Sequence, residues 1–428
     1  MKRCLLFLIL ASLFSLPLTA QYSVSGGLLA TKNGITEVYL LNGLMGAQIS
    51  FTSSTPGTHQ WYRFSQSIDD AVPIPCTQNG NTSVVSITQG DCGYYVASPI
   101  GTGYVWIVDY NLYNTKFSGL TVMEDENSCD QLKLTADAVV TPIYYYVNGV
   151  QNVLGREFLL SYNTLNWDED QKVFIPIDTT LVLNNISQIT TYSPPLTNTT
   201  FTLVDSFAVH LGIAQSISSA EYTAIKVEAH GYAVTTKENA DNEIHHAGDV
   251  MGGSAPITYT FTAYANDPTA ALYIWKIAQL DSATNTLTEK VRYTEKVLQY
   301  NFEQNGSYVV SLEVSDGQSV CVDTTQSFPI VIDNTLLQIP NAFSPGSSIG
   351  VNDELRVAYT SLIAFKASIY NRWGNLLFQW TDPAKGWDGR VNGKFVPTGV
   401  YFVIVEYKDS NGKNRTMSKA VNVLRAKE

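Results

Sequence analysis

The sequence predicts an all-β protein built from several β-sandwich domains in tandem. The chain has 428 residues, a length of two to four domains at roughly 100 to 200 residues each. Its 25 Tyr, 17 Phe and 7 Trp, with abundant Val and Thr, favour half-buried pleated surfaces over helices. Two stretches, 308–314 and 401–407, place apolar residues at every second position, as in a strand with one face in a core.

Composition and motifs exclude several classes of function. Lys and Arg number 26 against 38 Asp and Glu, for a net charge of −12, which repels phosphate backbones. We therefore expect no nucleic-acid partner. The sequence also lacks a nucleophile elbow, a His-Glu-x-x-His motif, a phosphate-binding loop and a Cys-x-x-Cys pair. We expect a protein that is not an enzyme and that binds no metal or cofactor.

Residues 1–20 predict a cleaved secretory signal. Lys2 and Arg3 precede an apolar run over residues 4–18 that is short for a membrane span. The small residue Ala20 then offers a cleavage site before Gln21. The alternative is an amino-terminal membrane anchor. No later stretch is long and apolar enough to cross a bilayer, so we expect a chain that is exported and not transmembrane.

The cysteines left after cleavage suit an oxidising compartment. Cys76 and Cys92 lie in one β-rich region, and closing a loop of about 15 residues contributes roughly 3 kcal/mol. They are the candidate disulfide, with free thiols as the alternative. The spacing of Cys129 and Cys321 fits no zinc pattern. These two cysteines are either buried thiols or partners in a long-range bridge.

One short motif, Gly-x-Tyr after a polar turn, occurs three times. A Tyr that opens a late strand can return its hydroxyl to the backbone, the tyrosine corner of immunoglobulin-like sandwiches. The last two copies are 93 residues apart, the length of one sandwich domain. The three copies end at Tyr95, Tyr308 and Tyr401.

Residues 33–112 resemble an immunoglobulin-like domain. Residues 47–51 read as an early strand, Trp61 stands where the third strand of such a sandwich carries a Trp, and residues 91–95 supply the corner. Residue 97, where the usual second Cys would stand, is Ala97. The inter-sheet disulfide of the family is therefore not expected here.

Residues 116–250 predict a second β-rich domain. Its strand-like stretches are residues 143–146, 157–162 and 172–177, while residues 206–217 favour a short helix. The polar, patternless residues 237–253 suggest a linker. The acidic run at residues 168–170 is most simply a solvated turn; a surface hydrolase with its site in this domain is the less favoured alternative.

Residues 252–333 resemble a polycystic-kidney-disease-type (PKD) sandwich. A strand at residues 254–261 precedes the central strand with Trp275, and the Tyr308 strand ends in a Ser-Asp-Gly turn. The usual acidic turn after the Trp is replaced by residues 276–280. The resemblance therefore implies no calcium site in that turn.

The strongest motifs lie in residues 336–428. Gly374 and Gly389 suit the positive φ of tight turns. Trp373 and Trp387 are expected to fill a small core, and Arg372 to stack on a ring or pair with Asp388. The full motif set is Pro340, Asn341, Phe343, Ser344, Pro345, Asn352, Asp353, Asn371, Arg372, Trp373, Gly374, Trp387, Asp388, Gly389, Pro397, Gly399 and Tyr401.

In order and spacing this set closely resembles the gliding-motility-associated, type B carboxyl-terminal sorting domain of the Bacteroidetes type IX secretion system. The resemblance implies a β-sandwich tag that folds independently and is read by the type IX translocon and the outer-membrane attachment machinery. It also implies a destination on the outer face of the outer membrane or in the medium.

The overall expectation is a tandem of immunoglobulin-like and PKD-like sandwiches with a carboxyl-terminal sandwich sorting domain. Such a protein would be adhesive or structural, with an unidentified surface protein or glycan as its ligand. The alternative is an accessory or signalling component of the secretion or gliding machinery.

Overall fold

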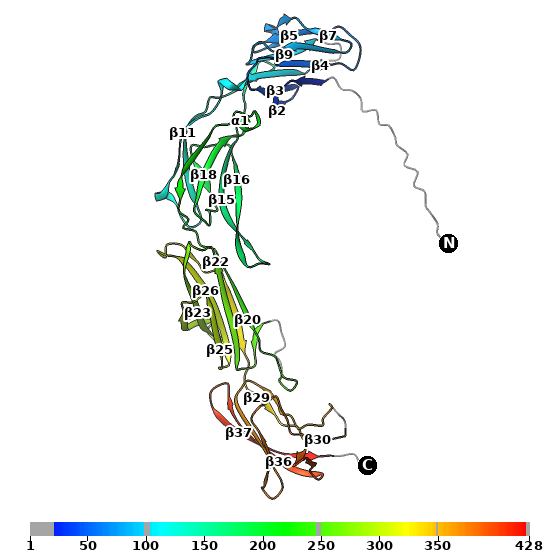
Figure 1. Ribbon diagram of the computed structural model, residues 1–428, viewed down its shortest axis with the longest axis vertical. Helices are drawn as coiled ribbons and strands as arrows, with labels where there is room; N and C mark the ends of the chain where they lie inside the picture. Colours follow the sequence, from blue (N-terminus) through cyan, green and yellow to red (C-terminus); the bar gives the residue numbers. More distant parts are fainter. Residues whose placement is uncertain (1–20, 98–102, 245–249, 348–349, 425–428) are drawn as a thin grey trace, which may run out of the picture.

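The computed structural model describes residues 21–97, 103–244, 250–347 and 350–424. The predicted signal at residues 1–20 lies outside these ranges. Four β-sandwich units follow one another in an elongated, curved arrangement (Figure 1). The predicted all-β fold is confirmed, and α1 (Ser206–His210) is the only α-helix within the described ranges.

The first sandwich begins before residue 33, because β1 and β2 belong to it. Tyr22 on β1 is buried and lies opposite Phe51 on β4. Trp61 on β5 is fully buried between the sheets. One sheet has the order β1 (Gln21–Val24), β4 (Gln48–Thr52), β8 (Thr82–Ser86), β7 (Thr77–Asn79). The other has the order β2 (Leu28–Asn33), β3 (Thr36–Leu41), β10 (Tyr104–Asp109), β9 (Cys92–Ala97), β5 (Gln60–Phe64), β6 (Val72–Ile74).

The corner tyrosine of the first sandwich is Tyr94, not the predicted Tyr95. Its hydroxyl donates to the Gln89 carbonyl at 2.8 Å. Tyr95 points to the opposite face of β9 and stacks on Tyr62 at 5.1 Å between ring centroids. Neighbouring strand residues face opposite sides, so a motif read one residue out of register selects the wrong ring.

The predicted Cys76–Cys92 disulfide is not formed, and both thiols are free. The Cys76 thiol donates to the His59 carbonyl at 3.5 Å, while that of Cys92 donates to the Gln89 carbonyl at 3.4 Å. The two sulfurs are thus directed to different carbonyls. Burial raises the pKa of Cys92 to about 11, so this thiol is a poor nucleophile at neutral pH.

The second sandwich occupies residues 116–222. The predicted helix at residues 206–217 begins where expected, with Asp205 as its N-cap, but ends early because Gly212 adopts φ +70° and a strand begins at Ser216. One sheet has the order β11 (Lys116–Val122), β12 (Leu132–Val139), β17 (Ile189–Thr191). The other has the order β16 (Val173–Leu183), β15 (Phe158–Asp168), β18 (Thr199–Asp205), β19 (Ser216–Tyr222), and β13 (Tyr144–Val147) pairs with β14 (Val150–Val153).

The third sandwich contains the segment that was predicted to be a linker. Strands β20 and β22 pair with each other, and residues 251–253 of the predicted linker form a strand of this sandwich, so the segment joins strands of one domain and not two domains. Trp275 on β23 is fully buried, and the Tyr308 hydroxyl donates to the Gln304 carbonyl at 3.1 Å, as a corner requires. One sheet has the order β20 (Ala229–Thr235), β22 (Ile257–Ala265), β25 (Val297–Phe302). The other has the order β21 (Met251–Gly253), β28 (Ser327–Ile332), β26 (Gly306–Asp316), β23 (Ala270–Asp281), β24 (Thr286–Tyr293), with β27 (Val322–Asp323) against β26.

The fourth sandwich builds its core cluster from its own residues, between Leu337 and Val423. Its main sheet has the order β30 (Ala342–Phe343), β37 (Asn414–Val423), β36 (Gly399–Asp409), β32 (Leu362–Tyr370), β33 (Leu376–Trp380). Two short pairs complete it: β29 (Leu336–Gln338) with β31 (Ala358–Thr360), and β34 (Arg390–Val391) with β35 (Lys394–Phe395).

The first two sandwiches share a hydrophobic cluster at their junction. Arg156 and Asp205 form a buried ion pair beside it, and the guanidinium also donates to the Thr115 hydroxyl at 2.8 Å. Since domains move freely unless their interface is substantial and apolar, this junction restricts motion. The cluster joins Val38, Leu40, Phe64, Trp106, Val108 and Tyr110 to Ile143, Tyr145, Leu154 and Ala208.

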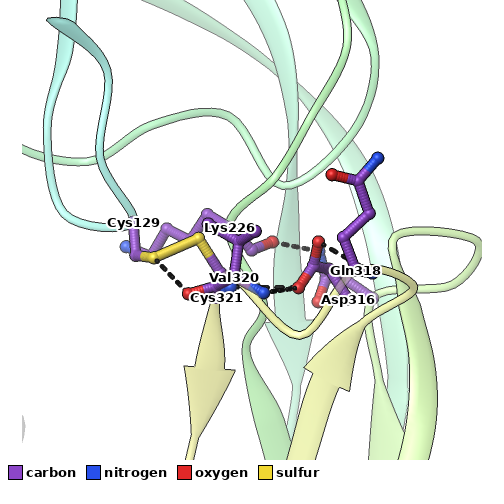
Figure 2. Close-up of a disulfide and its surroundings, with 7 residues drawn as sticks. Cys129, Lys226, Asp316, Gln318, Val320 and Cys321 are labelled. Atoms are coloured by element: carbon purple, nitrogen blue, oxygen red, sulfur yellow. Dashed lines mark hydrogen bonds between the residues drawn. A yellow bond between two sulfur atoms is a disulfide. The ribbon is translucent and has the colours of Figure 1, made fainter.

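The second and third sandwiches are linked covalently by the Cys129–Cys321 disulfide (Figure 2). The Asp316 carboxylate holds the turn that carries Cys321, accepting from the backbone N–H of Val320 at 2.7 Å and of Cys321 at 3.0 Å. Nearby, the buried Asn266 side chain donates to the Leu196 carbonyl at 2.8 Å. The long-range alternative left open by the sequence is the one that the structure adopts.

The third and fourth sandwiches are joined through residues 237–244, here called the loop 237–244. Asn242 donates from its side chain to the Val357 carbonyl at 2.8 Å, and the Ile244 N–H donates to the Tyr359 carbonyl at 2.7 Å. Beside them Glu243 is buried and pairs with Lys237 at 2.8 Å. The loop therefore extends the β29–β31 pair by main-chain hydrogen bonds.

Candidate functional site

The candidate site lies at the end of the fourth sandwich that is remote from the third. Strands β32 and β36 pair from Leu362 opposite Asp409 to Tyr370 opposite Phe402. The first pair adjoins the third sandwich, where the Asn305 N–H donates to the Ser410 carbonyl at 3.3 Å. Eight steps along a strand span about 26 Å, so the turn after β32 and the corner before β36 lie at the far end. Figure 1 shows β29 beside the third sandwich.

At this end two loops that carry motif residues enclose one surface groove of about 350 Å³, here called the sorting groove. One wall is the turn after β32 and the other is the corner before β36. Its lining residues are Asn371, Arg372, Trp373, Leu377, Val391, Val396, Pro397, Thr398, Gly399, Val400 and Tyr401.

The first wall is a tight turn fixed by Asn371. Its side-chain oxygen accepts from the N–H groups of Trp373 and Asn375, both at 3.0 Å. Gly374 adopts φ +82°, the positive angle expected for it. Because the turn is closed by its own hydrogen bonds, it holds the intervening side chains outward.

Trp373 is 70% exposed, so the expectation that it fills the core is wrong. The Arg372 guanidinium carbon lies 4.2 Å from the Trp373 ring centroid, which confirms the predicted stacking. The Arg372–Asp388 pair is not the one formed, because Asp388 lies 3.7 Å from Arg390. The groove thus presents a cation on an exposed indole.

The second wall is a tyrosine corner. The Tyr401 hydroxyl donates to the Pro397 carbonyl at 2.9 Å, and Gly399 between them adopts φ +147°. The corner leaves the following apolar side chains in solvent, Val400 at 48% and Phe402 at 44% exposure. Exposed apolar side chains beside a groove are typical of an interaction surface.

Other motif residues build the interior instead. Trp387 is fully buried against the Phe343 ring at 5.6 Å, and its Nε1 donates to the Arg390 carbonyl at 2.9 Å. Gly389 adopts φ +76°, and a Cβ there would lie 2.7 Å from Pro345. These residues hold the sandwich together and are not available for contact.

The remaining motif residues shape loops. Asn352 adopts φ +56° and its carbonyl accepts from the Ser344 N–H at 2.8 Å, while the Asp353 carboxylate accepts from the Gly350 N–H at 2.9 Å. The Asn341 carbonyl accepts from the Asn422 N–H at 2.9 Å, which places the Pro340–Asn341 segment next to β37. The sequence motif is therefore divided among an interior set, a set that shapes loops and the residues of the sorting groove.

The acidic run at residues 168–170 forms hydrogen bonds within the β15–β16 hairpin and with the third sandwich. The Glu169 carboxylate in the acidic run accepts from Tyr232 at 2.6 Å and from Trp167 at 2.8 Å, and these bonds lower its pKa. Within the described ranges no group of three or more His, Cys, Asp or Glu is arranged to hold a metal ion. In the sequence, His245 and His246 with Glu243 and Asp249 form the densest group of potential metal ligands, and residues 245–249 of that group lie outside those ranges. No helix in the described part has the length and apolarity of a membrane span.

Two family models match the chain. The fibronectin type III domain matches residues 121–219, and the CHU_C type IX secretion signal domain matches residues 337–422. No curated protein sequence matches.

Solved structures of low similarity also match. Three amino-terminal domains of the bacteriophage RB49 highly immunogenic outer capsid protein show 8% identity and a TM-score of 0.21 over 73% of this chain and 98% of theirs. Escherichia coli alpha-2-macroglobulin activated by porcine elastase shows 8% identity and a TM-score of 0.18 over 96% of this chain and 45% of its own. Scores this low carry no functional information. The carboxyl-terminal match does: the chain carries a type IX secretion signal domain and is exported by the type IX route to the cell surface or beyond.

Proposed function

We propose that the protein is a non-enzymatic surface rod whose sorting groove docks on the type IX translocon and the outer-membrane attachment machinery. The observation that carries this proposal is the exposure of two motif residues in the groove. The other motif residues pack in the core or hold loops by hydrogen bonds, yet the Arg372 and Trp373 side chains stand in solvent at the end of the fourth sandwich that is remote from the third. Exposing a large apolar ring to water is unfavourable, so its presence here supports a contact with another molecule.

Charge also supports docking at this end. Arg372 and the exposed Lys394 lie on the turn after β32 and on the β34–β35 hairpin, beside Arg390, which stacks on Phe395 at 4.2 Å and lies 3.7 Å from Asp388. The chain as a whole carries a net charge of −12. A basic patch on an acidic protein orients it towards an acidic partner.

A structural or adhesive role suits the rest of the rod. Its three junctions carry a shared apolar cluster, a disulfide and a main-chain pairing, respectively. Together these contacts oppose bending, as a stalk that holds a binding surface away from a membrane requires. The third sandwich is proposed to be PKD-like, since Trp275 is buried on a central strand and Tyr308 forms the corner at the start of a late strand, as in a PKD-type sandwich.

The test is the destination of a double variant, Arg372→Glu with Trp373→Ala, expressed in a cell that has the type IX system. Both side chains are exposed, so the fold should be retained. We expect at least a tenfold loss of surface protein by protease shaving, with folded protein accumulating in the periplasm. Tyr192→Ala, at an 81% exposed aromatic in the second sandwich, is the matched control. Normal surface delivery of the double variant would show that the groove is not the docking site.

A further inference from the structure

A second groove, of about 490 Å³, lies between the second and third sandwiches and is here called the interdomain groove. The end of the β15–β16 hairpin forms one side through Trp167, Lys172 and Phe174. Strand β22 and the segments beside it form the floor and the other side through Tyr264, Asp267 and Lys296. The groove therefore exists only where the two sandwiches are held together.

The hairpin end is locked in place before any ligand arrives. The Trp167 indole stacks on the His230 ring of the third sandwich at 4.3 Å with 6° between the planes. The Glu169 carboxylate accepts from both Trp167 and Tyr232, and the Lys172 ammonium lies 3.8 Å from the Tyr232 ring centroid. A groove with fixed walls loses little conformational entropy when it binds.

The junction adds a second constraint. The Cys129–Cys321 disulfide and the buried Asn266 tie the same two sandwiches together, and Asn266 directly precedes Asp267 of the groove. The spacing of the two walls is thus set by covalent and buried polar contacts. It does not depend on the hairpin alone.

The floor of the groove presents side chains, because the backbone N–H and C=O groups of β22 are engaged by strands on both sides. Strand β22 is central in its sheet, with Thr262 opposite both Tyr232 on β20 and Val297 on β25. An extended peptide that adds to a sheet needs an unpaired edge. At this floor recognition must instead come from rings and polar side-chain atoms.

The polar groups on the walls are paired and balanced in charge. Lys296 and Asp267 form an ion pair at 2.7 Å, and each side chain is more than half exposed. Lys172 lies beside Glu169 and contributes to lowering the pKa of that carboxyl. An anionic ligand therefore finds no uncompensated cation. The remaining donor and acceptor positions of these groups suit hydroxyl groups.

We infer that the interdomain groove binds a neutral oligosaccharide. A pyranose ring has an apolar C–H face and a rim of hydroxyls, which match aromatic side chains such as Tyr264 and the Lys296–Asp267 pair. The inference rests on the adhesive role proposed above but not on the export route. It assigns to the rod a class of ligand and a position for it, midway along the chain.

The experiment uses the exported chain, residues 21–428, with its disulfide intact. The probes are neutral tetrasaccharides of glucose, mannose, galactose and xylose, with galacturonic acid tetrasaccharide as the charged comparison, each titrated by calorimetry up to about 5 mM. We expect at least one neutral probe to bind. Tyr264→Ala and, separately, Lys296→Met should each weaken that binding at least tenfold while circular dichroism and the melting temperature stay unchanged.

Tyr192→Ala, which alters an exposed aromatic that does not line the groove, is the matched control and should bind normally. The inference is overturned if no neutral probe binds, if the acidic probe alone binds, or if Lys296→Met binds as well as the parent chain. Each of those results leaves surface delivery through the sorting groove untouched, so the two proposals fail separately.

Discussion

Replacing both Cys129 and Cys321 by Ser should lower the stability of the second and third sandwiches. The disulfide joins residues 192 positions apart, and the chain-entropy relation for a loop of that length gives about 5 kcal/mol. Unfolding of the second sandwich alone, with Cys321 still held in a folded third sandwich, frees a loop of roughly 100 residues and gives about 4.7 kcal/mol. The two routes agree, so the size of the effect does not depend on which sandwich unfolds first.

Disulfides often stabilise a protein by less than the entropy model predicts, so we take about 2 kcal/mol as the lower limit of the expected loss in the free energy of unfolding. For a domain of about 100 residues that loss corresponds to a fall of roughly 8 °C or more in the melting temperature. Scanning calorimetry at pH 7 would measure it. Cys76→Ser, at a half-buried free thiol, is the matched control and should change the melting temperature far less.

Thiol counting in denaturant provides a check that does not depend on stability. The exported chain should show two reactive thiols, Cys76 and Cys92, and four only after reduction. An unchanged melting temperature in the double Ser variant, or four thiols without reduction, would refute the reasoning.

Three further outcomes are expected. Trp387→Ala should destabilise the fourth sandwich by about 3 to 5 kcal/mol in chemical denaturation, because it empties a fully buried site. Asp205→Ala should cost about 3 to 5 kcal/mol, since it leaves Arg156 buried without its partner; a loss below 1 kcal/mol would contradict the buried pair. A hydrogen bond from Arg415 and two from backbone N–H groups lower the pKa of Asp409 below 3.8. The ionised Asp409 carboxylate therefore stabilises the folded state above pH 3.8, and this stabilisation is lost as the pH falls through the lowered pKa. Acid titration of Arg415→Gln should show a smaller loss over that range.

The strand pattern could be predicted from local sequence, but the direction of some side chains could not. The alternating residues 308–314 and 401–407 form β26 and β36 with alternate residues in the core. The same logic failed at Tyr95, where Gly93 opens the motif but the Phe64 ring lies 2.0 Å from where its Cβ would stand. Gly93 is a glycine because it makes room for the Phe64 ring, and not because it opens a tyrosine corner. The sequence around Gly93 cannot show this, because Phe64 belongs to the neighbouring strand.

The candidate site was predicted as a set of residues and not as a surface. The motif around residues 371–374 and 397–401 forms a tight turn and a tyrosine corner, as turn chemistry predicts, because that chemistry is local. Whether Trp373 faces the core or solvent depends on which face of the sandwich is already filled, and Trp387 fills it. The interdomain groove carried almost no sequence signal, because its residues come from two domains whose docking is long-range.

The sequence by itself determined the β architecture and the secretion signal, since alternation, turn glycines and motif spacing act over a few residues and need no partner elsewhere. The tertiary structure alone decided the Cys129–Cys321 pairing, the attachment of loop 237–244 to the fourth sandwich and the two grooves. The reason is physical: these features join residues far apart in the chain, and their energies depend on distances that only the folded packing sets.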